Sequence, residues 1–234
     1  MSGASQATPD DAREMSPGVD DVGAMDESAV RPAAIVRQLG HAVAMTAVLL
    51  VLCGVIYPAT LYALGRVAFA NQANGSLIHD RTGRVVGSAL IGQSFARPEY
   101  FHGRRSATGY NAANTSGSNL GPTNPTLIDS VRTSASRFRA ENLLSDSVHL
   151  PSDASTSSGS GIDPDISPAN ARLQIARVAR ARGVDTVALR TLVDNHVQPR
   201  QLRVLGEPRV NVLLLNLAAD SAFGAPAALT AGPQ

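Results

Sequence analysis

The stretch "QLGHAVAMTAVLLVLCGVIYPATLYALG", residues 38–65, decides the fold because it contains no Asp, Glu, Lys or Arg. As a helix rising about 1.5 Å per residue, an apolar span such as residues 42–63 reaches roughly 33 Å and covers a hydrocarbon core of about 30 Å. We therefore predict one transmembrane helix at residues 38–66. Pro58 lies in its outer part, where it removes one backbone hydrogen bond and is expected to kink the helix.

Two other interpretations of this stretch stay open. The first is a buried helix of a soluble protein, although such helices are rarely this long and apolar on every face. The second is a cleaved signal peptide, because residues 68–70 read Ala-Phe-Ala, although the apolar stretch exceeds the usual limit of roughly 15 residues. If the helix is retained, Arg31 and Arg37 at one end and Arg66 at the other favour a cytoplasmic N-terminus.

The segments around the helix differ in composition. Residues 1–30 carry seven acidic residues against Arg13 alone and show no apolar periodicity, which is typical of a chain that cannot bury enough surface to fold. We predict a disordered acidic tail over residues 1–37 and a folded domain over residues 71–220. Residues 221–234 are rich in Ala, Gly and Pro and predict a flexible C-terminal tail.

Strand and helix signals alternate within the domain. Short β-prone runs at residues 76–78 and 84–91 flank Asp-Arg-Thr-Gly and predict a hairpin. The stretch "PRVNVLLLNLAA", residues 208–219, is nearly continuously apolar and predicts a strand covered on both faces. Helices are expected after the cap residues Asn124, Ser167 and Asp185. The fold class is therefore α+β, one N-terminal transmembrane helix followed by a small mixed α/β domain.

The helix after Ser167 is expected to begin at Pro168 and to end at Gly183, since proline is common at the first helical position and glycine just past the last. One face is expected to be buried and is formed by Ala171, Ile175, Val178 and Ala179. Most of the arginines, namely Arg172, Arg177 and Arg180, are placed on another face. This is an ordinary amphipathic pattern.

Composition excludes several kinds of chemistry. The net charge is +1, and all 20 basic residues are Arg, so neither nucleic-acid binding nor Schiff-base or P-loop lysine chemistry is expected. Cys53 is the single cysteine and cannot form an intramolecular disulfide. The five histidines are dispersed without metal-ligand spacing, so no metal site is expected. "SGSGID", residues 158–163, lacks the P-loop pattern and is interpreted as an ordered turn.

Five polar motifs follow the apolar span in a fixed order. They are ANGSLI at 73–78, GS-x-LIGQ at 87–93, SNLGP at 118–122, SGSG-x-DP at 158–164 and VNV-x-x-LN at 210–216. In this order they resemble the KdpC family, the C subunits of Kdp potassium-transporting P-type ATPases, over residues 57–220. Three positions depart from the family pattern: Arg105 stands where proline is usual, Ser116 where glycine is usual, and Asp165 where histidine is common.

The resemblance implies a non-catalytic subunit of a high-affinity, ATP-driven potassium uptake complex. Its partners would be the potassium-translocating KdpA, the ATP-hydrolysing KdpB, the small KdpF and the lipid bilayer. Its place would be the bacterial cytoplasmic (inner) membrane, as a single-pass protein with a cytoplasmic N-terminus and an extracytoplasmic domain. The family is also described as assisting assembly and as a catalytic chaperone that raises the ATP affinity of KdpB. No catalytic site and no bound cofactor of its own are implied, and ATP enters through the complex.

The resemblance singles out Gln174, which precedes the "RVARAR" segment, as a nucleotide-related residue. A glutamine has many possible hydrogen-bond partners, and we favour a position on a solvated helix face. An extracytoplasmic domain would face a compartment without an ordinary ATP supply, so we expect it mainly to stabilise the pump and to cover the potassium-entry side of KdpA. A membrane-anchored extracytoplasmic hydrolase and a stand-alone structural module remain the alternatives, although no G-x-S-x-G motif occurs.

Overall fold

The structure is a computed structural model that describes residues 32–80 and 83–226, with side chains from residue 35 onward. It divides into two compact units, one ending at Leu64 and the other beginning at Gly65. Most of the predicted acidic tail (residues 1–37) and most of the predicted C-terminal tail (residues 221–234) lie outside the described residues. Of the described parts of these tails, residues 32–37 and 221–223 are helical.

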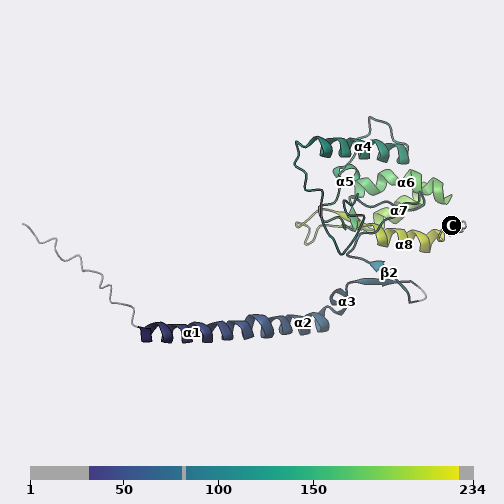
Figure 1. The fold of residues 1–234 in the computed structure, drawn as a ribbon. Coiled ribbons are helices and arrows are strands. Elements are labelled where there is room, and N and C mark those ends of the chain that lie inside the picture. Colours follow the sequence, from purple (N-terminus) through teal and green to yellow (C-terminus); the bar gives the residue numbers. More distant parts are fainter. Residues whose placement is uncertain (1–31, 81–82, 227–234) are drawn as a thin grey trace, which may run out of the picture. The chain divides into compact units, whose positions relative to one another are not determined.

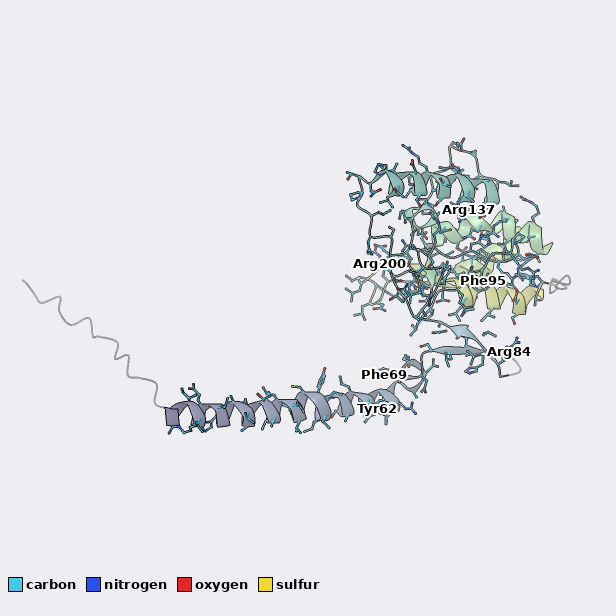
Figure 2. All side chains as sticks on the ribbon, viewed as in Figure 1. Tyr62, Phe69, Arg84, Phe95, Arg137 and Arg200 are labelled. Atoms are coloured by element: carbon cyan, nitrogen blue, oxygen red, sulfur yellow. The ribbon has the colours of Figure 1, made fainter. Side chains whose placement is uncertain are left out.

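The apolar stretch forms a long helical run, as predicted. It consists of α1 (Pro32–Val51), the π-helical turn η1 (Leu52–Ile56) and α2 (Tyr57–Ala68). Over residues 35–68 it is long and apolar enough to cross a membrane, and none of its most apolar window is buried within the protein. Figure 2 shows its side chains projecting outward, Tyr62 among them. The π turn precedes Pro58, whose ring would clash with the carbonyl of Gly54 in a regular α-helix, so the helix widens by one residue there.

The domain opens with a hairpin that confirms the sequence prediction. After the short α3 (Ala70–Ala73), β1 (Leu77–His79) pairs antiparallel with β2 (Val85–Ser88). The Oγ of Ser88 donates to the Gly75 carbonyl oxygen at 2.7 Å, which ties the second strand to the turn before the first. The hairpin is thus joined to the segment that follows the membrane helix.

A second sheet has three very short antiparallel strands. β5 (Arg209–Asn211) lies between β3 (Asp165–Ile166) and β4 (Val197–Gln198). The predicted strand over residues 208–219 is therefore wrong beyond Asn211, where α8 (Val212–Phe223) begins. The Asn211 side chain accepts a hydrogen bond from Leu214 N at 3.1 Å, which caps the helix. The fully buried residues of α8 lie on one broad face, but the other positions of its first two turns are also apolar and are half-buried, so the sequence does not alternate between apolar and polar faces.

The remaining helices begin at the predicted caps. They are α4 (Pro125–Asn142), α5 (Ser152–Ser155), α6 (Pro168–Arg182) and α7 (Thr186–Asn195). Asn124, Ser167 and Asp185 each accept a hydrogen bond from a backbone N–H in the first turn that follows. Gly183 ends α6 with a φ of 67°, a left-handed conformation that favours glycine. Figure 1 shows α4, α6, α7 and α8 as successive layers of the domain, and each contacts the next.

The core lies where α6, α7, α8 and β5 meet. Its largest fully buried apolar side chain, Phe101, comes from an irregular segment rather than from a helix or strand. The other members of this cluster are Ile166, Ala171, Ile175, Val178, Ala179, Leu189, Val193, Val210, Val212 and Leu215. The predicted apolar face of α6 is confirmed, because all four of its members are buried.

Residues 158–163 form the ordered turn that the sequence indicated. Ser158 is buried, its Oγ accepts a hydrogen bond from Gly161 N at 2.9 Å, and its own N–H donates to the Arg105 carbonyl oxygen at 2.8 Å. Gly92 N donates to the Ile162 carbonyl oxygen at 2.7 Å, so a distant loop lies against the same turn. The glycines and serines of this segment therefore serve close backbone packing.

We expect Gly161→Ala to destabilise the domain by about 1–3 kcal/mol. Gly161 has a φ of 75°, and an added Cβ would lie 2.8 Å from the Ser116 carbonyl oxygen. Gly159→Ala is the matched control, because a Cβ at that position meets no atom within 4 Å. The measurement is the thermal unfolding midpoint of the full chain in detergent. Equal midpoints for the two variants would contradict the packing described for this turn.

Candidate functional site

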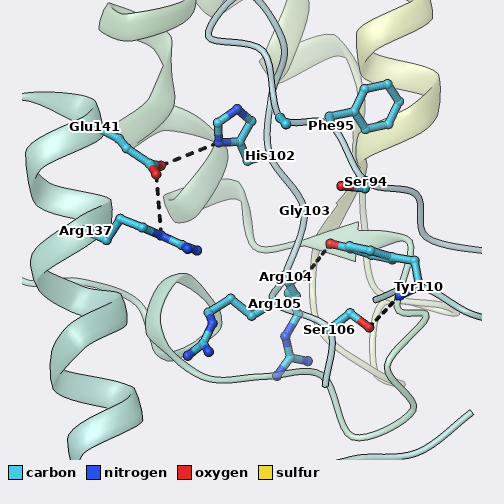
Figure 3. Close-up of a pocket in the computed structure, with 11 residues that line it drawn as sticks. Ser94, Phe95, His102, Gly103, Arg104, Arg105, Ser106, Tyr110, Arg137 and Glu141 are labelled. Carbon is cyan, nitrogen blue, oxygen red and sulfur yellow. Dashed lines mark hydrogen bonds and ion pairs between the residues drawn. The ribbon is translucent and has the colours of Figure 1, made fainter. Parts of the chain in front are cut away.

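A polar cavity of about 450 Å³ opens between α4 and the irregular segment that carries Phe101. Figure 3 shows His102 and Glu141 on one side of it and the guanidinium groups of Arg137, Arg105 and Arg104 nearby. A second hollow of about 390 Å³ shares His102 and Glu141 and is lined also by Arg177 and Arg180. We call the two hollows together the arginine cleft.

The floor of the arginine cleft is an extended segment whose partners are side-chain amides. Phe101 N donates to Asn216 Oδ1 at 2.8 Å, and Asn216 Nδ2 donates back to the Phe101 carbonyl oxygen at 3.0 Å. His102 N donates to Gln174 Oε1 at 2.8 Å, and Gln174 Nε2 donates back to the His102 carbonyl oxygen at 3.1 Å. Successive residues of an extended chain present their polar groups to opposite sides, so α8 serves one residue and α6 the next.

Gln174 is completely buried, so the expectation of a solvated helix face is wrong. Besides its two bonds to His102, its Oε1 accepts from Arg177 Nη2 at 2.7 Å and its Nε2 donates to Asn170 Oδ1 at 2.9 Å. Both donors and both acceptor positions of the amide are thus in use. Helical spacing carries the missed signal, since Gln174 lies three residues after Ala171 and four before Val178 and so shares their buried face.

Arg177 is also buried, which corrects its predicted place on the polar face of α6. Its Nη1 donates to the carbonyl oxygens of Pro98 at 2.6 Å and Tyr100 at 3.0 Å, and its Nε donates to Asn142 Oδ1 at 3.0 Å. Burial lowers the pKa of Arg177 to about 10, while the charge of Glu141 acts in the opposite direction. The group therefore stays cationic at neutral pH and joins α6, α4 and the segment before His102.

The two ring nitrogens of His102 face different groups. Its Nε2 lies 3.1 Å from the Arg97 carbonyl oxygen and 3.4 Å from Arg177 Nη1. Its Nδ1 faces Glu141 Oε2 at 3.6 Å. Burial and, next, the positive charge of Arg177 lower the pKa of His102 below its ordinary value. With both ring nitrogens directed at other groups, His102 is not arranged as the base of a serine nucleophile, which weighs against the hydrolase alternative.

The other arginines of the cleft hold its walls together. Arg104 pairs with Asp163 at 2.9 Å and donates to the Ser157 carbonyl oxygen at 3.1 Å. Arg105 reaches α4, where Nη1 donates to Ser130 Oγ at 3.1 Å and also contacts Ser134 Oγ. The arginine at the position where the family usually has proline thus bridges the loop and the helix. Within the described residues, no group of three or more His, Cys, Asp or Glu side chains could hold a metal ion.

The sequence matches the family model described as KdpC, the K+-transporting ATPase c chain, over residues 39–221. The chain belongs to the KdpC family. A potassium-transporting ATPase KdpC subunit of Caulobacter vibrioides is 57% identical over 175 residues, covering 74% of this chain and 87% of the relative. Those of Gemmatimonas aurantiaca and Rhodopseudomonas palustris are 51% and 48% identical, each covering 80% of this chain and 94% and 100% of the relative respectively.

Membership in the KdpC family means that the arginine cleft belongs to a subunit of a transport complex. The chain is a membrane-associated subunit of a potassium-transporting ATPase and has one apolar N-terminal helix. A subunit of a complex has partner subunits. The family match spans both the helix and all residues of the arginine cleft.

We expect Gln174→Ala to destabilise the domain by about 2–4 kcal/mol, because it leaves the backbone of His102 and one Arg177 nitrogen buried without their partner. The exposed Gln72 of α3 provides the control, and Gln72→Ala should change stability by less than about 0.5 kcal/mol. Chemical denaturation of the full chain in detergent measures both. A Gln174→Ala chain as stable as the control would refute the role assigned to the amide.

The low pKa of His102 predicts a pH dependence of stability. A histidine whose pKa is lower in the folded than in the unfolded chain stabilises the fold above the unfolded value, about 6.5, and loses that contribution as the pH falls below it. The unfolding free energy should therefore decrease below about pH 6.5, and His102→Asn should flatten this decrease. His149→Asn, at an exposed position, should leave the profile unchanged. Denaturation at several pH values tests this, and identical profiles for both variants would disprove it.

Proposed function

We propose that this chain is the non-catalytic C subunit of a high-affinity, ATP-driven potassium uptake complex, with KdpA, KdpB and KdpF as its partners. The observation that carries the proposal is the KdpC family match over residues 39–221, which spans the helix and the domain together. The alternative of a membrane-anchored hydrolase has less support, since the one histidine of the cleft is directed at a carbonyl oxygen and a carboxylate.

The single helix explains why partners are needed. One helix encloses no pore, and residues 38–65 carry no Asp, Glu, Lys or Arg that could form an ion path. Transport and ATP hydrolysis are therefore tasks of other subunits, while this chain contributes an anchor and an ordered domain. We infer that it assists assembly of the pump and raises the ATP affinity of the hydrolysing subunit, as a catalytic chaperone.

We further infer a cytoplasmic N-terminus and an extracytoplasmic domain in the bacterial inner membrane. The support is the arginine distribution, Arg31 and Arg37 before the helix and Arg66 at its end. In this topology the domain would cover the potassium-entry side of KdpA, and any effect on ATP would cross the membrane through the other subunits. Gln174 would then influence nucleotide affinity indirectly, by holding His102 and Arg177 in place.

Deletion of residues 71–220 with retention of the helix tests this function. We expect the purified complex to assemble poorly, or to show lower potassium-stimulated ATPase activity with a higher KM for ATP. The reason is that the helix alone retains none of the ordered domain surface. Affinity purification in mild detergent with an ATPase assay measures both properties, and the exposed α4 substitution Arg132→Ala serves as the control. Normal assembly, activity and KM in the truncated form would exclude the proposed role.

A further inference from the structure

The connection between β4 and β5 exposes three apolar side chains at its end. Leu202, Val204 and Leu205 have 87%, 72% and 56% of their surface exposed. We call these three residues the apolar tip. Isolated exposed leucines are common, whereas three large apolar residues within four positions of one connection concentrate exposed apolar surface locally.

Part of the backbone of this connection is hydrogen-bonded within the connection itself. Gln201 N donates to the Leu205 carbonyl oxygen and Leu205 N to the Gln201 carbonyl oxygen, both at 2.9 Å. Val204 N also donates to the Gln201 carbonyl oxygen, and Arg203 N donates to that of Arg200, both at 3.1 Å. Such bonds are usual in a tight turn, and they reduce the number of unpaired polar groups that the turn would carry into an apolar medium.

The tip also has a strained backbone. Leu202 and Arg203 have φ values of 51° and 63°, in the left-handed region that non-glycine residues seldom occupy. Such strain persists only where the surroundings impose it, and it clusters at functional positions. Here the tight turn exposes Leu202 rather than allowing it to fold back onto the domain.

Charged side chains lie both at the base of this connection and within the apolar tip. At the base of the connection, Arg200 Nη2 contacts both carboxylate oxygens of Glu207 at 2.7 and 2.6 Å, so these charges neutralise each other. Figure 2 labels Arg200 at the edge of the domain. Arg203 lies within the tip itself and forms no ion pair with any of the described residues. An arginine beside exposed leucine and valine side chains is the combination found where a protein meets acyl chains and phosphate groups.

The residue types of the apolar tip favour a lipid surface over a protein partner. Binding hot spots between proteins are enriched in Trp, Tyr and Arg and poor in Leu and Val. The apolar tip has three aliphatic residues and no aromatic residue, and Arg203 is the one residue type in it that both kinds of surface share. The domain is joined to the apolar helix by a short connection, because α2 ends at Ala68 and β1 begins at Leu77. The segment that joins them, residues 69–76, can span at most about 28 Å at roughly 3.5 Å per residue.

We propose that the apolar tip inserts into the membrane interface, with Arg203 at the level of the lipid phosphates. The connection then forms a second membrane contact of the chain, in addition to its helix. This contact would fix the orientation of the domain at the bilayer. The inference rests on membrane association of the chain and is independent of any effect on ATP affinity.

The absence of Trp from the sequence allows a direct test. Leu202→Trp places a single fluorophore in the tip, and the full chain is reconstituted into phosphatidylcholine vesicles with or without brominated acyl chains. We expect the brominated lipid to quench the emission of the introduced tryptophan strongly. Val187→Trp, at an exposed position of α7, is the control and should keep its emission. Val204→Trp provides a second reporter if the first variant folds poorly.

The second arm of the test concerns the charge. Adding Arg203→Glu to the Leu202→Trp chain should reduce quenching, and the reduction should be larger in vesicles that contain phosphatidylglycerol. Emission that is unaffected by brominated lipid at both reporter positions would overturn the proposal. So would a blue shift of the Leu202→Trp fluorophore seen only in the assembled complex and without quenching, since it would assign the tip to a partner subunit. Loss of ATPase activity plays no part in the readout, so this test and that of the proposed function can fail separately.

Discussion

The pairing of two consecutive backbone residues with two side-chain amides is the constraint on which the domain depends. Phe101 exchanges hydrogen bonds with Asn216, and His102 exchanges them with Gln174. A buried peptide group without a partner costs about 1–3 kcal/mol, so an irregular segment could not otherwise pass through the core. Because both amides are on helices, α6 and α8 must stand at fixed positions on either side of the segment, and Phe101 is thereby placed at the centre of the core.

Hydrogen bonds from side chains to the backbone also occur elsewhere in this domain, whose strands are few and short. Arg177 and Arg182 donate to carbonyl oxygens of the segment that precedes Phe101, and Asn211 Nδ2 donates to the Ala89 carbonyl oxygen at 2.8 Å. In this domain, side chains supply the hydrogen bonds to the backbone that neighbouring strands supply in a sheet, because every buried polar backbone group needs a partner. The long polar segments are consequently ordered, which suits a subunit whose loops form contact surfaces.

The chemistry of the arginine cleft follows from this architecture. Arg177 is cationic but bonded to neutral oxygens, and its charge helps to keep His102 neutral. Arg104 and Arg105 use their guanidinium groups to join loops to each other and to α4. These residues determine the shape and the charge of the arginine cleft. Such a role agrees with membership in the KdpC family, whose members are subunits of a larger potassium-transporting ATPase.

Local patterns in the sequence were sufficient for the long apolar helix, the first hairpin and the capped starts of α4, α6 and α7, because each depends on neighbouring residues alone. The motifs also sufficed to indicate the family. Tertiary structure decided that residues 212–223 form a helix, because a nearly continuously apolar stretch is compatible with a buried strand or a buried helix, and here it packs as a helix against α7 and β5. It also decided the backbone partners of Gln174 and Arg177. Helical spacing can indicate that Gln174 shares a buried face, but the carbonyl and N–H groups that the two side chains bind lie more than 70 residues away in sequence.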